Sequence, residues 1–163
     1  MVACMSKEDG MYHHAGRMTP AQGVHLTSHQ PVIVWLTVCT KDRVAWLTQS
    51  EVMETLHEIW ATRATAWVMG DYLLMPDHVH GFCSPHQPGI EVESWVAFWK
   101  SQLTRARSNQ DRRWQRGVFH HRLRSLEEFR KKSIYMLENP LRKGYVERCE
   151  DWPWRGRVHD VRW

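Results

Sequence analysis

Two histidines separated by one apolar residue are the side chains of this sequence best suited to chemistry. They stand in Met75-Pro76-Asp77-His78-Val79-His80, directly after a Pro-Asp pair of the kind that forms turns. The segments 67–74 and 78–83 are predicted to form the two strands of a hairpin around this turn. Because side chains alternate along a strand, both imidazoles should lie on one face of the sheet, where they could bind a divalent metal. By itself, the spacing is equally typical of surface histidines.

A tyrosine and an asparagine further along the chain form the second candidate pair. The capping-box pattern Ser125-x-x-Glu128 predicts a helix that begins near residue 126. Tyr135 and Asn139 are four residues apart and should therefore lie on the same face of this helix. In the alternative interpretation, Tyr135 is a packing residue and Asn139 caps a new short helix with Pro140 at its first position. The spacing leaves both interpretations open.

Taken together, the two motifs resemble the REP-associated tyrosine transposases, which belong to the single-tyrosine HUH class, where U is a hydrophobic residue. The resemblance covers the chain from about Val32 onward. It rests on Met75–His80, Trp114-Gln115-Arg116-Gly117, His121-Arg122-Leu123-Arg124 and Tyr135-x-x-x-Asn139-Pro140-Leu141-Arg142-x-Gly144, with Thr40-x-Asp42-Arg43 and Asp151-Trp152-Pro153-Trp154 outside them.

The resemblance implies a reaction and a role for each residue. His78 and His80 would be metal ligands, Asn139 a third polar ligand and Tyr135 the nucleophile, with Mg²⁺ or Mn²⁺ as the cofactor. The expected substrate is single-stranded DNA that folds as a hairpin at repeated palindromes. Cleavage would leave a 5′-phosphotyrosine and a free 3′-hydroxyl for later strand transfer. The expected protein is a monomer, although a dimer stays open.

One position departs from the pattern of the relatives. Where they commonly read Phe-Asp-His-Arg-Leu-Arg, this chain has His120 followed by His121. If the aspartate of the relatives assists metal binding or orients a ligand, His120 would change the efficiency of cleavage. We therefore treat His120 and His121 as auxiliary candidates.

Positive charge is concentrated in one part of the chain. The net charge is only +4 and the pI about 9.0. The stretch 100–132, however, is rich in lysine and arginine, and its only acidic residues are Asp111, Glu127 and Glu128. Such a cluster of positive charge is typical of a surface that binds a phosphate backbone. Any one of these charges could simply face solvent without binding DNA, but this explanation fits the whole cluster less well. The predicted DNA-binding residues are Lys100, Arg105, Arg112, Arg113, Arg116, Arg122, Arg124 and Arg142.

The order of the expected elements predicts the fold. Residues 1–30 should form a flexible arm, 31–145 the catalytic domain and 146–163 a tail that packs on the domain or extends it. A second capping box, Thr48-x-x-Glu51, predicts a helix, and another should span about 91–107 with its tryptophans in the core. With strands at 31–40, 67–74, 78–83 and 118–123, this order predicts an α+β protein with a ferredoxin-like (RRM-like) antiparallel sheet. The tyrosine-bearing helix would then cover the His-x-His face.

Other classes of protein are less compatible with the sequence. No apolar run approaches the roughly 20 residues of a membrane span, and we expect a cytoplasmic protein without membrane contact. A zinc site of His78, His80 and Cys83 is disfavoured, since strand alternation turns Cys83 away from the histidines. Two alternatives remain. One is an HUH replication initiator or relaxase, and the other a non-catalytic nucleic-acid-binding module that uses Tyr72 and Phe82.

Overall fold

The computed structural model describes residues 32–107 and 112–163, so the predicted arm at 1–30 lies outside the described residues. The strands are β1 (Val34–Cys39), β2 (Trp67–Met75), β3 (His78–Pro85), β4 (Phe119–Arg122) and β5 (Arg155–Arg157). The main helices are α1 (Ser50–Glu58), which continues as the π-helical turn η2 (Ile59–Arg63), α2 (Val92–Ala106) and α3 (Leu126–Arg142). Short 3-10 turns occur at η1 (Lys41–Arg43) and η3 (Cys149–Asp151).

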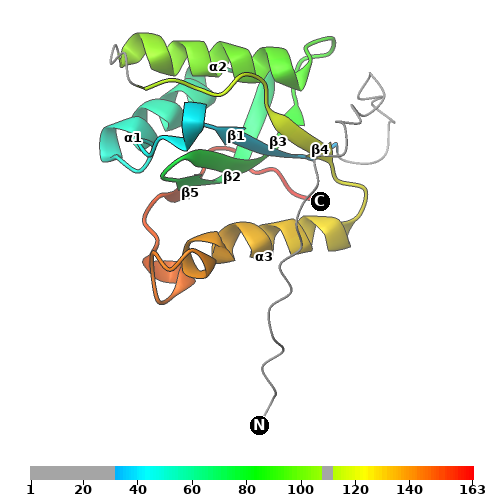
Figure 1. The fold of residues 1–163 in the computed structure, drawn as a ribbon. Helices are drawn as coiled ribbons and strands as arrows, with labels where there is room; N and C mark the ends of the chain where they lie inside the picture. Colours follow the sequence, from blue (N-terminus) through cyan, green and yellow to red (C-terminus); the bar gives the residue numbers. More distant parts are fainter. Residues whose placement is uncertain (1–31, 108–111) are drawn as a thin grey trace.

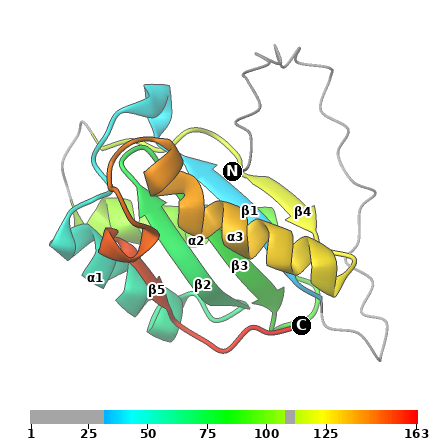
Figure 2. The ribbon, with the colours of Figure 1, turned by 90° about the horizontal axis from the view of Figure 1, so that it is seen from below.

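The sheet has the strand order β4-β1-β3-β2-β5, and all its pairings are antiparallel. Its first four strands have the arrangement of a ferredoxin-like sheet, so the predicted α+β class is confirmed. Helices α1 and α2 cover one face and α3 the other (Figure 1). Viewed from the α3 side, this helix lies across the strands of the hairpin and β1 (Figure 2). The last strand, β5, extends the sheet beyond β2, where Arg157 pairs with Asp71.

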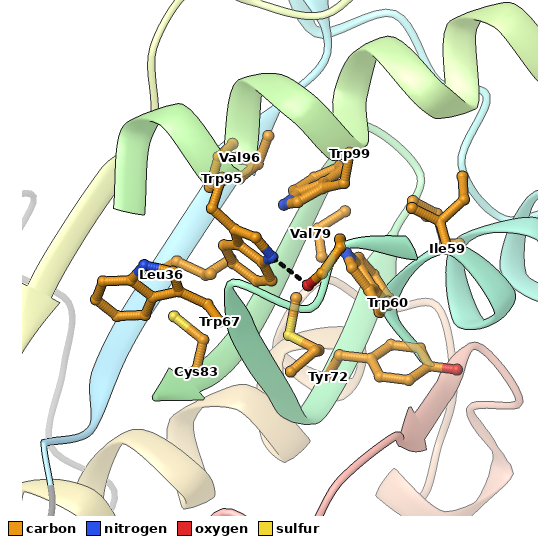
Figure 3. Packing of buried hydrophobic residues seen from close by; sticks show 14 of the residues in the cluster. Leu36, Ile59, Trp60, Trp67, Tyr72, Val79, Cys83, Trp95, Val96 and Trp99 are labelled. Atoms are coloured by element: carbon orange, nitrogen blue, oxygen red, sulfur yellow. Dashed lines mark hydrogen bonds between the residues drawn. The ribbon is translucent and has the colours of Figure 1, made fainter. Parts of the chain in front are cut away.

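The larger core lies between the sheet and the helices α1 and α2. Its tryptophans are buried, and the two on α2 are at most 2% exposed, which confirms the prediction that those of α2 pack in the core. Two of the indole N–H groups are paired, since Trp95 donates to the carbonyl of Ala64 at 2.7 Å (Figure 3) and Trp67 donates to that of Ile90 at 2.7 Å. A buried indole that keeps a hydrogen-bond partner avoids the cost of desolvating its N–H group. This layer therefore holds α1 and α2 firmly on the far side of the sheet from α3.

A smaller core lies between the sheet and α3. Trp35, Phe82, Leu123 and Met136 are its main members, and each is at most 3% exposed. Phe129 packs on Phe82 with a distance of 4.7 Å between ring centroids. Burial of this apolar surface fixes the position of α3 over the sheet.

Two predicted helix starts have different outcomes. Ser125 is the N-cap of α3 and accepts a hydrogen bond from the backbone N–H of Glu128 at 3.1 Å, as predicted. The predicted capping box at Thr48 is wrong, because α1 begins at Ser50 with Gln49 as its N-cap and no side-chain cap. The N–H groups of Trp46 and Leu47 bond to the carbonyl of Pro76, which holds the preceding segment on the hairpin turn. Glu51 is thereby placed at the second helical position, whereas a capping box needs it at the third.

Candidate active site

The two histidines of β3 point to the α3 face of the sheet. His80 is paired with Thr37 of β1, and both histidines are only 5% exposed. Their Nε2 atoms lie 3.1 Å apart. Strand alternation therefore brings the imidazoles together as predicted, with one nitrogen of each ring directed at a shared point.

The other nitrogen of each ring is held by a neighbouring side chain. Nδ1 of His78 lies 2.6 Å from a carboxylate oxygen of Asp77, and Nδ1 of His80 lies 2.9 Å from the hydroxyl of Thr37. Because a carboxylate only accepts hydrogen bonds, Asp77 keeps the proton of His78 on Nδ1 and leaves its Nε2 unprotonated. Asp77 is itself paired with Arg43 at 2.8 Å. Support of this kind is characteristic of histidines that bind metals.

The surroundings of both imidazoles favour the neutral form over the protonated form. Burial lowers the pKa of His80 to about 3, and the positive charges of Lys132 and Arg43, together with repulsion from His78 when that ring is protonated, lower it further. Burial also lowers the pKa of His78, although its hydrogen bond to Asp77 acts in the opposite direction. A histidine must be unprotonated to bind a metal, so the surroundings favour the state that a ligand needs.

Asn139 brings a third polar group to the same point. It is 5% exposed, and its amide nitrogen lies 3.0 Å from Nε2 of His80. A half-turn of the amide about its last bond places the oxygen, a suitable metal ligand, where the nitrogen now lies. The helix runs on past this residue, since the N–H of Lys143 bonds to its carbonyl at 3.1 Å. The alternative prediction, in which Asn139 caps a new helix at Pro140, is therefore wrong.

The donors at this point could hold a divalent cation, and imidazole nitrogens suit Mn²⁺ better than the harder Mg²⁺. Within residues 32–107 and 112–163, no group of three His, Cys, Asp or Glu side chains could hold a metal, so the third protein ligand would have to be the amide of Asn139. Cys83 belongs to the core on the opposite face, which excludes the zinc alternative. Two imidazoles and one amide oxygen would leave positions open for oxygens of a substrate.

Tyr135 lies one helical turn before Asn139, at the edge of the donor cluster. Its ring centroid is 5.8 Å from that of His80 and 6.2 Å from that of Trp35. The residue is 39% exposed, so a substrate can reach it. Two cations flank the ring, with Nζ of Lys132 at 5.6 Å and Cζ of Arg142 at 5.0 Å from its centroid. The predicted nucleophile is thus close to the histidines and surrounded by positive charge.

The predicted basic residues differ in their contacts and in their exposure. Arg142 lies at Tyr135, whereas Arg112 donates to Gln49, beside the N-terminus of α1, at 2.7 Å. Five of the predicted residues are exposed to solvent, namely Arg105, Arg113, Arg116, Arg124 and Arg142, whereas Arg122 is partly buried.

For Lys100, the predicted contact with DNA is wrong. It is only 8% exposed, and its ammonium donates to the carbonyls of Gln115 and Gly117 at 2.7 and 2.8 Å. Burial lowers its pKa to about 8. Its charge serves to hold the segment before β4 on α2, in place of the predicted contact with DNA.

His120 and His121 lie on opposite faces of β4. Nε2 of His120 is 2.6 Å from a carboxylate oxygen of Glu93 on α2. His121 faces α3, where its Nε2 lies 3.8 Å from Glu128. The position that departs from the pattern of the relatives therefore points away from His78 and His80, so it gives them no direct support in this chain.

Several residues of the site were missed from the sequence. Thr37, Asp77 and Lys132 were not assigned roles, although Asp77 directly precedes His78 and could have been recognised as its support. Thr37 gave no local signal, because its contact with His80 depends on how β1 and β3 are paired. Tyr72 and Phe82, on which the non-catalytic alternative depends, are each 1% exposed and cannot stack on bases. None of the described helices has the length and apolar character needed to cross a membrane.

A ferredoxin-like sheet with a His-x-His pair beneath a tyrosine-bearing helix is the arrangement that the described part of the chain defines. No family model matches the chain. It is 28% identical over 102 residues to a protein of Haemophilus influenzae assigned as a REP-associated tyrosine transposase, a match that spans 55% of this chain and only 58% of that protein. It is 23% identical over 128 residues to the REP-associated tyrosine transposase of Escherichia coli, covering 78% of this chain and 77% of the relative.

A solved structure has the same fold. It is that of a REP-associated tyrosine transposase bound to a REP hairpin, with a TM-score of 0.66, 22% identity and coverage of 80% of this chain and 88% of the other. The resemblance of this chain to the REP-associated tyrosine transposases is thus confirmed, by its relatives in sequence and by the fold in structure.

Proposed function

We propose that this protein is a metal-dependent endonuclease and strand transferase that acts on single-stranded DNA at hairpin-forming repeated palindromes. The observation that carries the proposal is the meeting of three side chains at Nε2 of His80, beside the exposed Tyr135. This atom lies 3.1 Å from Nε2 of His78 and 3.0 Å from the amide nitrogen of Asn139. The names of the relatives, and the REP hairpin held by the solved relative, support this substrate class.

The proposed reaction is an in-line displacement at phosphorus. The hydroxyl oxygen of Tyr135 attacks the phosphate and the bond from phosphorus to the 3′-oxygen breaks. The phenolic proton passes to solvent, and the leaving 3′-oxygen takes up a proton from solvent. The products are a 5′-phosphotyrosine and a free 3′-hydroxyl, so the ester is conserved for a later joining step in the reverse direction. Mg²⁺ or Mn²⁺ held by His78, His80 and Asn139 would polarise a non-bridging oxygen and offset the charge of the transition state.

The chain's own residues help the tyrosine in two ways. A free tyrosine has a pKa of about 10 and is a weak nucleophile at neutral pH. The charges of Lys132 and Arg142 lie beside the ring, where they attract the phosphate of the substrate. Packing of Trp35 against both Lys132 and His80 keeps the phenol, the ammonium and the imidazole in a fixed arrangement.

Formation of a covalent adduct tests this proposal. Incubation with a labelled hairpin oligonucleotide carrying a single-stranded flank, in the presence of Mn²⁺, should give a protein–DNA adduct that survives denaturation. Tyr135→Phe should abolish the adduct and retain hairpin binding, because only the hydroxyl is removed. The matched control is Tyr145→Phe, which changes an exposed tyrosine that packs on Trp152 beyond the end of α3. An adduct of full yield in Tyr135→Phe would show that another residue attacks.

A further inference from the structure

A pocket of about 340 Å³ lies beside Tyr135, between α3 and the end of β4. Its lining residues are His121, Leu123, Glu128, Lys131, Lys132 and Tyr135. None of the predicted metal ligands lines it, so it is separate from the donor cluster and shares with the site only the tyrosine. Its volume falls in the range of roughly 300–1,000 Å³ that is typical of small-ligand sites.

The walls of the pocket offer three kinds of contact. Leu123 is 1% exposed and supplies apolar surface, while the rings of His121 and Tyr135 are partly exposed. Lys131 and Lys132 supply positive charge from α3. Unpaired bases are bound in proteins by stacking on rings and by hydrogen bonds to their Watson–Crick edges, with cations on the neighbouring phosphates. The combination of rings, apolar surface and cations suits one nucleotide of a single strand.

Glu128 gives the pocket a chemical preference. One oxygen of its carboxylate, Oε2, accepts a hydrogen bond from the backbone N–H of Arg124 at 2.6 Å. The other, Oε1, lies 3.8 Å from Nε2 of His121, and no hydrogen bond to it is formed within the described part of the chain. A carboxylate can only accept hydrogen bonds, so the complementary group is a donor. Adenine, cytosine and guanine carry an exocyclic amino group at an edge of the ring. Thymine has none, and its one ring donor, N3–H, lies between two carbonyl oxygens that would repel the carboxylate.

We propose that this pocket binds one unpaired base adjoining the phosphate attacked by Tyr135, and that Glu128 selects a base with an exocyclic amino group. The inference rests on the proposed function, since it requires a DNA strand that reaches Tyr135. Because the pocket adjoins the nucleophile, the selected base is one of the two that flank the cleaved bond.

Single-turnover cleavage of a set of hairpin oligonucleotides tests the inference. Each of the two flanking positions is occupied in turn by each of the four bases. At one position, the wild type should cleave the thymine substrate roughly tenfold more slowly than the best of the others, the factor expected for one lost base contact. At the other position, we expect thymine to cause no such slowing.

Substitution of Glu128 identifies the selecting group. Capping boxes use Glu or Gln at this position, so Glu128→Gln keeps the cap of α3 while its amide offers a donor as well as an acceptor. We expect thymine to be cleaved within about twofold of the other bases in this variant. Glu127→Gln is the matched control, because Glu127 lies in the same turn, pairs with Lys131 at 2.6 Å and does not line the pocket. It should discriminate as the wild type does.

Two results would overturn the inference. One is equal cleavage of all four bases at both positions by the wild type, and the other is wild-type discrimination in Glu128→Gln. If the wild type forms no adduct with any substrate of the set, the proposed function itself fails, and the base selection fails with it.

Discussion

The side-chain amide of Asn139 lies 3.0 Å from Nε2 of His80, although 59 positions separate the two residues in the chain. The same Nε2 atom lies 3.1 Å from that of His78, so donors from β3 and α3 meet at one point. Tyr135 lies one turn earlier on α3. The helix that completes the donor cluster therefore also carries the proposed nucleophile, and a shift of α3 would disturb both.

Asn139 can be tested by metal titration. Asn139→Ala removes the amide oxygen, and we expect the Mn²⁺ concentration for half-maximal cleavage to rise by roughly tenfold or more. Asn139→Asp keeps an oxygen and adds charge, so it should cleave at the wild-type concentration or below it. The titrations are run at a temperature where thermal melting shows each variant to be folded. Identical midpoints for wild type and Asn139→Ala would exclude the ligand role.

Asp77 is expected to act through His78. Asp77→Asn replaces the acceptor of the Nδ1 proton by an amide that can turn its N–H₂ group towards the ring, which disturbs the tautomer and the orientation of the imidazole. Mn²⁺ affinity, measured by the loss of the free-ion electron paramagnetic resonance signal, should fall by about 10–100-fold. Asp71→Asn is the control, because it breaks an aspartate–arginine pair between β2 and β5. Equal affinities in the two variants would contradict a role for Asp77 in positioning the ligand.

Lys132 is expected to contact the attacked phosphate. Its ammonium lies over the rings of Trp35 and Tyr135, and it makes no ion pair with any residue of 32–107 or 112–163. Lys132→Ala should slow single-turnover adduct formation by about tenfold to a hundredfold, as expected for loss of a charged hydrogen bond. The neighbouring Lys131→Ala should have a smaller effect, since Lys131 is already paired with Glu127.

A neutral methylphosphonate at the cleaved position separates the two explanations for a slow Lys132→Ala variant. If Lys132 acts on the phosphate charge, the difference from wild type should shrink on this substrate. An undiminished difference would mean that Lys132 supports only the packing of α3.

The salt dependence of DNA binding distinguishes surface cations from Lys100. For single strands, the log–log slope of affinity against salt should fall by about 0.7 for each phosphate contact that is removed. Replacing Arg112 and Arg113 by Ala should flatten the slope if both contact the backbone. Lys100→Met should leave the slope unchanged and lower the free energy of unfolding by about 1–3 kcal/mol, because two hydrogen bonds from a charged donor are lost. A flatter slope in Lys100→Met would show that Lys100 does contact the DNA backbone.

The sequence by itself determined the hairpin, the start of α3 and the face of the sheet on which the histidines lie. Period-two alternation places His78 and His80 on one side of β3 and Cys83 on the other. The Ser125 cap defines the start of α3, and the four-residue spacing puts Tyr135 and Asn139 on the same side of that helix. These features depend only on local periodicity and capping, which neighbouring residues encode directly.

Only the tertiary structure decided which side chains meet. The contact of Thr37 with His80 depends on the register between β1 and β3, and that of Asn139 with His80 depends on the position of α3 over the sheet. The charges in the sequence did not show that Lys100 is buried, whereas Lys132 lies beside the tyrosine. The reason is that the long aliphatic stem of a lysine lets its ammonium reach either solvent or backbone carbonyls. Register, helix placement and the path of a lysine side chain are set by packing between distant segments, and no local pattern carries that information.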